Sequence, residues 1–125
     1  MNLENQHHSV EEQLHRLDRS VALSRVGGDE DLLREVVALF LDDYPLSLEL
    51  IRTAIRQGDS VSLERHAHSL KGSVSTFGAQ EVFEAALALE KQGRNQDLSA
   101  AEAGLQHLET ALEELRPELE SLQLV

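Results

Sequence analysis

Leucine, valine and alanine recur at helical spacing along most of this 125-residue chain. The clearest case is the stretch 61–77, where five apolar residues are separated by intervals of four, three, four and three: Leu63, Ala67, Leu70, Val74 and Phe77. That spacing places all five side chains on one face of an α-helix. Strand-like alternation with β-branched residues is absent from the sequence. The chain is therefore expected to be all-α.

Capping residues and glycines predict where the helices of the first half begin and end. Ser9 with Glu12 forms a capping-box pattern that opens a first helix, and Gly27-Gly28 ends it. Asp29 is expected to cap a second helix. That helix contains Pro45, which removes a backbone hydrogen bond, so we expect a bend there.

The same signals place two more helices. Asp59 or Ser60 should cap the helix that carries the 61–77 stripe, and Gly78 should end it. Residues 79–92 are expected to form the next helix because their apolar residues again follow helical spacing. Residues 93–97 are expected to form a loop.

Ser99 with Glu102 repeats the capping-box pattern and predicts the start of the last helix. Pro117 is expected to interrupt this helix with a kink, and Leu119 and Leu122 predict that it continues beyond. Residues 1–8 are expected to form a flexible leader. Residues 9–125 are expected to form one domain, an antiparallel up-down-up-down four-helix bundle with an additional N-terminal helix packed across it.

Composition narrows the class of function. Eleven basic against 23 acidic residues give a formal net charge of −12, which disfavours nucleic acid and anionic membranes as partners. The chain has no cysteine, so disulfides and thiolate metal sites are excluded, and we expect no metal or cofactor of its own. No signal peptide or membrane-length apolar run stands out. A cytoplasmic monomer is therefore expected.

His68, Lys71 and Gly72 form the most informative polar cluster. At about 100° per residue, His68 lies roughly 140° from the centre of the apolar stripe, so its imidazole should face water. Lys71 and Gly72 should be its neighbours on the helix surface. A glycine inside a helix costs roughly 0.5–1 kcal/mol relative to alanine, and here it would let another macromolecule approach the imidazole. This arrangement suits the carriage of a phosphoryl group delivered by a partner protein.

The same residues carry a family resemblance. The run Ala67-His68-Ser69-Leu70-Lys71-Gly72, followed by Gly78-Ala79, resembles the signature of the histidine-containing phosphotransfer (HPt) domains of bacterial multistep phosphorelays. The resemblance extends over about 100 residues, from near Asp18 to near Leu119. It implies that His68 accepts a phosphoryl group from a receiver-domain aspartate and relays it to another. It also implies that the receiver supplies the Mg²⁺.

Each residue of the cluster then has an expected role. His68 would use Nε2 as the nucleophile while a partner holds Nδ1–H; the alternative is a solvated surface histidine. Lys71 would contact phosphoryl oxygens or a receiver carboxylate as a mobile charge, or would simply be solvated. Glu90 follows the apolar stripe of the next helix, where many HPt domains place a polar residue that orients the histidine. A surface glutamate in a helix ion pair is the equal alternative.

Three functions remain open from the sequence. The favoured one is a phosphorelay intermediate whose partners are the receiver domains of a hybrid sensor kinase and of a downstream regulator. Because no ATP-site motif is visible, the chain is expected to be a phosphocarrier and not an enzyme. The alternatives are the phosphoacceptor domain of a chemotaxis-type histidine kinase and a non-catalytic helical adaptor.

Overall fold

The computed structural model describes residues 16–123, and within that range it contains helices and no strand. The helices are α2 (Arg19–Arg25), α3 (Glu30–Gln57), α4 (Ser60–Ser75), α5 (Gln80–Arg94) and α6 (Ala101–Gln123). The prediction of an all-α fold is confirmed.

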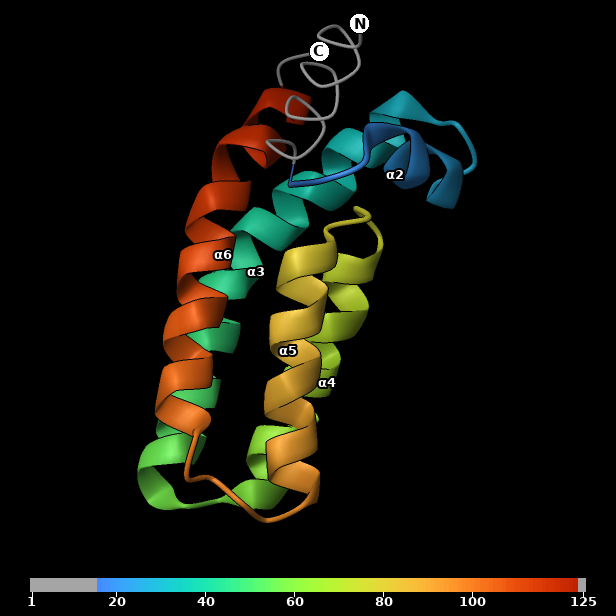
Figure 1. The fold of residues 1–125 in the computed structure, drawn as a ribbon. Helices are drawn as coiled ribbons and strands as arrows, with labels where there is room; N and C mark the ends of the chain where they lie inside the picture. Colours follow the sequence, from blue (N-terminus) through green and yellow to red (C-terminus); the bar gives the residue numbers. More distant parts are fainter. Residues whose placement is uncertain (1–15, 124–125) are drawn as a thin grey trace, which may run out of the picture.

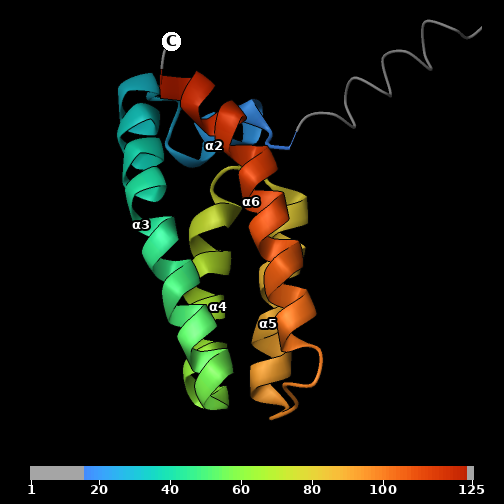
Figure 2. The same ribbon diagram turned by 90° about the vertical axis from the view of Figure 1, so that its left-hand side faces the viewer.

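Four long helices form an antiparallel bundle (Figure 1). α3, α4, α5 and α6 run along its long axis, and each reverses the direction of the one before it. Each packs against two neighbours, because α3 contacts α4 and α6, and α5 contacts the same two helices. The short α2 lies across one end, beside the start of α3 and the turn between α4 and α5 (Figures 1 and 2). The predicted four-helix bundle with an extra N-terminal helix is thus confirmed.

The predicted N-terminal helix is interrupted just before Arg19. Ser9, Glu12 and the predicted leader lie outside the described residues. Residues 16–18 are not helical, and the Asp18 side chain caps a new helix by accepting a hydrogen bond from the Val21 amide at 3.1 Å. The backbone amides of residues 16 and 17 donate instead to the carboxylate of Glu118 on α6. A distant side chain therefore satisfies donors that a continuous helix would have used.

The caps of α3 and α4 follow the prediction, with Asp29 accepting from Leu32 N and Asp59 from Ser62 N, each at 3.0 Å. The predicted end of α4 is wrong, because the helix ends at Ser75 and not at Gly78.

Gly78 lies in the turn that follows α4. Its φ of +62° favours glycine, and an added Cβ would lie 2.9 Å from the Cβ of Asp18. Glycine is therefore required where this turn meets the N-cap of α2.

Two predicted features of the last helix are also wrong. Ser99 does not cap α6, which begins at Ala101; its hydroxyl donates to Asp97 Oδ1 at 2.8 Å. α6 continues through Pro117 to Gln123, so the predicted continuation is confirmed and the predicted interruption is wrong; α3 likewise continues through Pro45. Each proline lacks the N–H that would bond to the carbonyl four residues earlier. Both prolines are exposed, so water can solvate that carbonyl instead. Figure 2 shows α3 changing direction near its middle, in keeping with the expected bend.

α4 and α5 approach closely at Gly93. This residue was predicted to be in a loop, but it is buried within the last turn of α5. A Cβ at position 93 would lie 2.6 Å from Glu64 N and 2.8 Å from Ser60 O. The missing side chain therefore lets the backbone of α5 contact the first turn of α4.

A matched pair of substitutions tests this contact. Backbone atoms surround position 93, so Gly93→Ala should lower the free energy of unfolding by about 1–3 kcal/mol through overpacking. No atom lies within 4 Å of a Cβ at Gly72, so Gly72→Ala should raise it by about 0.5–1 kcal/mol. Urea unfolding followed by circular dichroism measures both values. Equal effects of the two substitutions would contradict the close approach.

Candidate functional site

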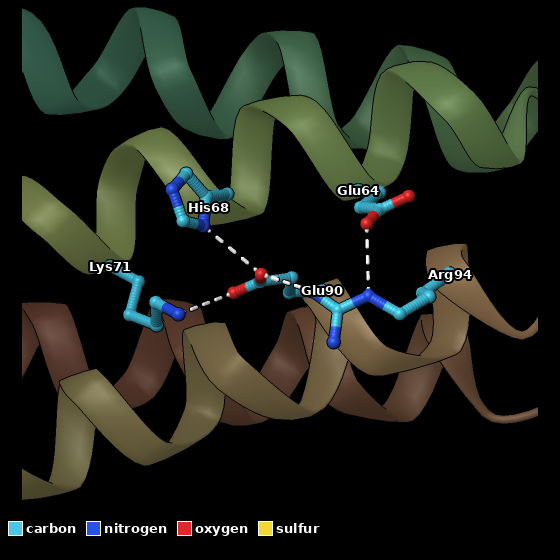
Figure 3. A network of polar contacts seen from close by, with 5 residues as sticks. All are labelled: Glu64, His68, Lys71, Glu90 and Arg94. Atoms are coloured by element: carbon cyan, nitrogen blue, oxygen red, sulfur yellow. Dashed lines mark hydrogen bonds and ion pairs between the residues drawn. The ribbon is translucent and has the colours of Figure 1, made fainter.

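His68 projects from the outer face of α4. Its side chain is 66% exposed, whereas the opposite face of the helix is buried in the core through Leu63, Ala67, Leu70 and Val74. The orientation predicted from helical spacing is therefore confirmed. One side of the ring faces α5, and the other faces away from it (Figure 3).

Glu90 of α5 is the group that the imidazole meets. Its side chain is only 3% exposed, and its Oε2 lies 3.0 Å from His68 Nδ1. An ionised carboxylate can only accept a hydrogen bond, so Nδ1 carries the proton in this contact. The other ring nitrogen, Nε2, then keeps its lone pair and points away from Glu90 (Figure 3).

Two cations bind the same carboxylate. Lys71 Nζ lies 2.8 Å from Glu90 Oε1, and Arg94 Nη2 lies 2.6 Å from Glu90 Oε2. Arg94 Nε also donates to Glu64 Oε2 at 3.0 Å, so its guanidinium joins α5 to α4. These five side chains form one continuous polar network across the two helices (Figure 3).

The network changes what was expected of Lys71 and Glu90 from the sequence. Lys71 is 19% exposed and bound to Glu90, with Nζ 5.8 Å from the centre of the Phe83 ring, so it is not the freely mobile charge that was expected. Glu90 is a buried partner of His68 and also half of an i,i+4 ion pair with Arg94. The alternative of a surface glutamate is therefore wrong for Glu90, although the carboxylate does form an ion pair within its own helix.

Sequence reasoning missed Glu64 and Arg94. The i,i+4 spacing of Glu90 and Arg94 was a visible signal. The predicted loop over residues 93–97 excludes Arg94 from the helix, whereas α5 continues to Arg94. The contact between Glu64 and Arg94 joins residues 30 positions apart, and local spacing cannot reveal it.

Opposing effects act on the Glu90 carboxyl. Burial by itself raises its pKa, because it disfavours the charged form. The hydrogen bonds from Lys71 and His68 and the charge of those groups outweigh burial and hold the pKa of Glu90 below its usual range. The carboxylate is therefore ionised at neutral pH, as its role as a pure acceptor requires.

A shallow groove runs beside the imidazole between α4 and α5. It is lined by Val61, Glu64, Arg65, His68, Glu90 and Arg94. Val61 is 64% exposed, and with Arg65, His68 and Gly72 it follows the outer face of α4 at helical spacing. The imidazole thus stands on an open surface that combines apolar and charged groups.

The sequence matches the family model of the Hpt domain over residues 35–118, roughly two thirds of the chain. The chain belongs to the Hpt family. It is similar to the crystal structure of histidine-containing phosphotransfer protein B (HptB) from Pseudomonas aeruginosa PAO1, with 27% sequence identity and a TM-score of 0.80. That match covers 86% of this chain and 94% of HptB. No curated protein sequence matches the chain.

A second solved structure shares the fold. The HPT domain of a sensor hybrid histidine kinase from Shewanella is 22% identical, with a TM-score of 0.75, over 87% of this chain and 94% of that domain. Membership of the Hpt family makes this chain a histidine phosphotransfer protein of phosphorelays. Hpt domains carry phosphoryl groups and are not, as a class, ATP-dependent enzymes. Between residues 16 and 123, no helix has the length and apolar character needed to cross a membrane.

The titration of Glu90 provides a test of the network. Lys71→Met removes a hydrogen bond and a positive charge, so it should raise the pKa of Glu90, measured by the carbon-13 NMR shift of its carboxyl. Lys91→Met is the matched control, because Lys91 is exposed on α5, the helix that carries Glu90. Equal pKa values of Glu90 in the two variants would contradict the assigned network.

The lowered pKa of Glu90 also determines how the stability of the protein changes with pH. A carboxyl with a depressed pKa in the folded state stabilises the protein above its unfolded pKa and loses that contribution as the pH falls through its folded pKa. Wild-type protein should therefore lose stability on acidification more steeply than Glu90→Gln.

Proposed function

We propose that His68 is the phosphoryl acceptor of this Hpt protein and that it relays the group between receiver-domain aspartates. One observation carries the assignment. The buried carboxylate of Glu90 holds Nδ1 of an otherwise exposed imidazole, which leaves Nε2 free at the surface. A solvated surface histidine needs no such buried partner.

The transfer step follows from this tautomer. The lone pair of Nε2 attacks the phosphorus of the receiver's acyl phosphate, and the Nε2–P bond forms as the bond from phosphorus to the aspartate oxygen breaks. The electron pair of that bond returns to the aspartate carboxylate. Nε2 bears no proton, so no general base is needed. The ring becomes positively charged, and the carboxylate of Glu90 stabilises the Nδ1–H that it already holds.

The reverse step uses the same groups. A carboxylate oxygen of the next receiver attacks phosphorus, the Nε2–P bond breaks, and its electron pair returns to Nε2. The imidazole leaves in its neutral form because Nδ1 has kept its proton throughout. Glu90 thus serves both acceptance and donation as the orienting residue.

The remaining machinery is assigned to the partner. Lys71 and Arg94 are engaged with Glu90, so the receiver would supply Mg²⁺ and most of the groups that stabilise the transferring phosphoryl charge. The proposal includes a monomeric phosphocarrier in the cytoplasm, without an ATP site of its own. Its partners would be the receivers of a hybrid sensor kinase and of a downstream regulator.

Gly72 is assigned to the approach of the receiver. It lies one turn beyond His68 on the exposed face of α4, and the space beside it is open. A partner's backbone or side chains can therefore come close to the imidazole at this point.

Replacing the acceptor tests the proposal directly. His68→Gln should abolish labelling both by phosphorylated receiver domains and by a small phosphoramidate, because the amide has no nucleophilic lone pair comparable to that of Nε2. His66→Gln, a change of the half-buried histidine two residues earlier, should keep its label. Label retained in His68→Gln would contradict the assignment, and a wild type that neither donor labels would favour the adaptor alternative.

The role of Gly72 predicts a difference between large and small donors. Gly72→Leu should slow transfer from a receiver by about ten- to a hundredfold, because it displaces the docked partner from the imidazole. Its reaction with phosphoramidate should change little, since a small donor needs no docking surface. Gly72→Ala should lie between wild type and Gly72→Leu. An equal loss with both donors would indicate damage to His68 and not a block to docking.

A further inference from the structure

Arg94 and His68 donate to the same oxygen atom. Arg94 Nη2 lies 2.6 Å and His68 Nδ1 lies 3.0 Å from Glu90 Oε2. Lys71 occupies the other oxygen, Oε1, so Arg94 is the cation that shares the oxygen used by the imidazole. Figure 3 shows this oxygen between the imidazole and the guanidinium.

Arg94 is held in this position from two sides. Its Nε donates to Glu64 Oε2 at 3.0 Å, and Glu64 lies one turn before His68 on α4. Its neighbour Gly93 brings the last turn of α5 against the backbone at Glu64. The position of the guanidinium is thus fixed by both helices, although its side chain is 55% exposed.

Sharing the oxygen weakens the hold of Glu90 on the imidazole. A charged donor draws negative charge on Oε2 toward itself, which leaves less for Nδ1–H. The guanidinium also lies in the groove of the imidazole, where it disfavours a second positive charge. Both effects oppose the charged ring that exists while the phosphoryl group is on Nε2.

We infer that Arg94, fixed by Glu64, is a positioning residue that lengthens the lifetime of phosphorylated His68. The inference rests on the proposed function of His68. In hydrolysis a water oxygen bonds to phosphorus as the Nε2–P bond breaks, and the electron pair of that bond remains on Nε2. The ring leaves as neutral imidazole only when Nδ1 carries a proton; otherwise it must leave as an imidazolate anion. By loosening the hold of Glu90 on that proton, Arg94 slows the loss of the group to water.

Charged side chains from both helices surround the imidazole, and one of them provides a control for Arg94. Glu64, Arg65 and Lys71 face it from α4, and Glu90 and Arg94 face it from α5. Arg65 carries the same charge as Arg94 and lines the same groove, but from α4. Arg65→Met therefore removes an equal charge and leaves the pair of bonds to Glu90 Oε2 in place.

The experiment measures hydrolysis of the protein phosphorylated by phosphoramidate, followed by phosphorus-31 NMR from mildly acidic to alkaline pH. Arg94→Met should hydrolyse about two- to fivefold faster than wild type near neutral pH, the size expected for a partly exposed charge contact. The pH above which hydrolysis slows should also move upward. Arg65→Met should show a smaller change on both counts, and Arg94→Lys should fall between wild type and Arg94→Met.

A double substitution separates this role from a direct contact between Arg94 and the phosphoryl group. In the Glu90→Gln background the shared carboxylate is gone and only the charge of the guanidinium remains, so Arg94→Met should alter the lifetime no more than Arg65→Met does. A larger effect in that background would overturn the inference, as would an equal or longer lifetime of Arg94→Met beside wild type. A wild type that takes up no label at His68 would overturn the proposed function itself, whereas a labelled wild type with an unchanged Arg94→Met lifetime would overturn only the inference.

Discussion

The carboxylate of Glu90 is the interaction on which the site depends. A buried charge is costly unless it is paired and hydrogen-bonded, and Glu90 meets that condition through His68, Lys71 and Arg94. Two of these partners come from α4 and one from α5. The same contacts that make the carboxylate tolerable therefore also join the two helices.

The backbone allows this network to form. Gly93 permits the end of α5 to lie directly against the start of α4, which sets the separation of the helices where the charged side chains meet. Glu64 is part of that close contact, and Arg94 reaches it from the next residue along α5. A wider spacing would leave Glu90 too far from Nδ1 for a hydrogen bond. Packing at one glycine thus brings the charged residues of α5 within reach of His68 on the neighbouring helix.

The two nitrogens of the imidazole have different surroundings. The Nδ1 side is fixed by groups in and beside the interface of α4 and α5, whereas the Nε2 side stands on an open surface with Gly72 and Val61 nearby. The two packed helices hold the ring from its Nδ1 side and leave its other side open to solvent. For the proposed phosphotransfer, this arrangement would leave Nε2 accessible to a receiver without enclosing it in a pocket.

The sequence by itself determined the helical class of the fold, the face of α4 from which His68 projects, and the caps at Asp29 and Asp59. These features depend on residues within a few positions of one another, where helical spacing and side-chain capping act directly. The HPt resemblance, carried by residues 67–72, also indicated the family that the comparison with known proteins confirmed. Glu90 was identified as a candidate at the apolar stripe of its helix, but its contacts with Lys71 and Arg94 were not predicted.

Only the tertiary structure decided the rest. The backbone amides just before α2 donate to Glu118, which is distant in sequence, and α6 continues through Pro117, which faces solvent. Residues 93–97 are predicted to be a loop, and only the contact of Gly93 with the backbone of α4 shows why glycine is needed inside a helix. Contacts between helices fix these features, and no local pattern in the chain records them.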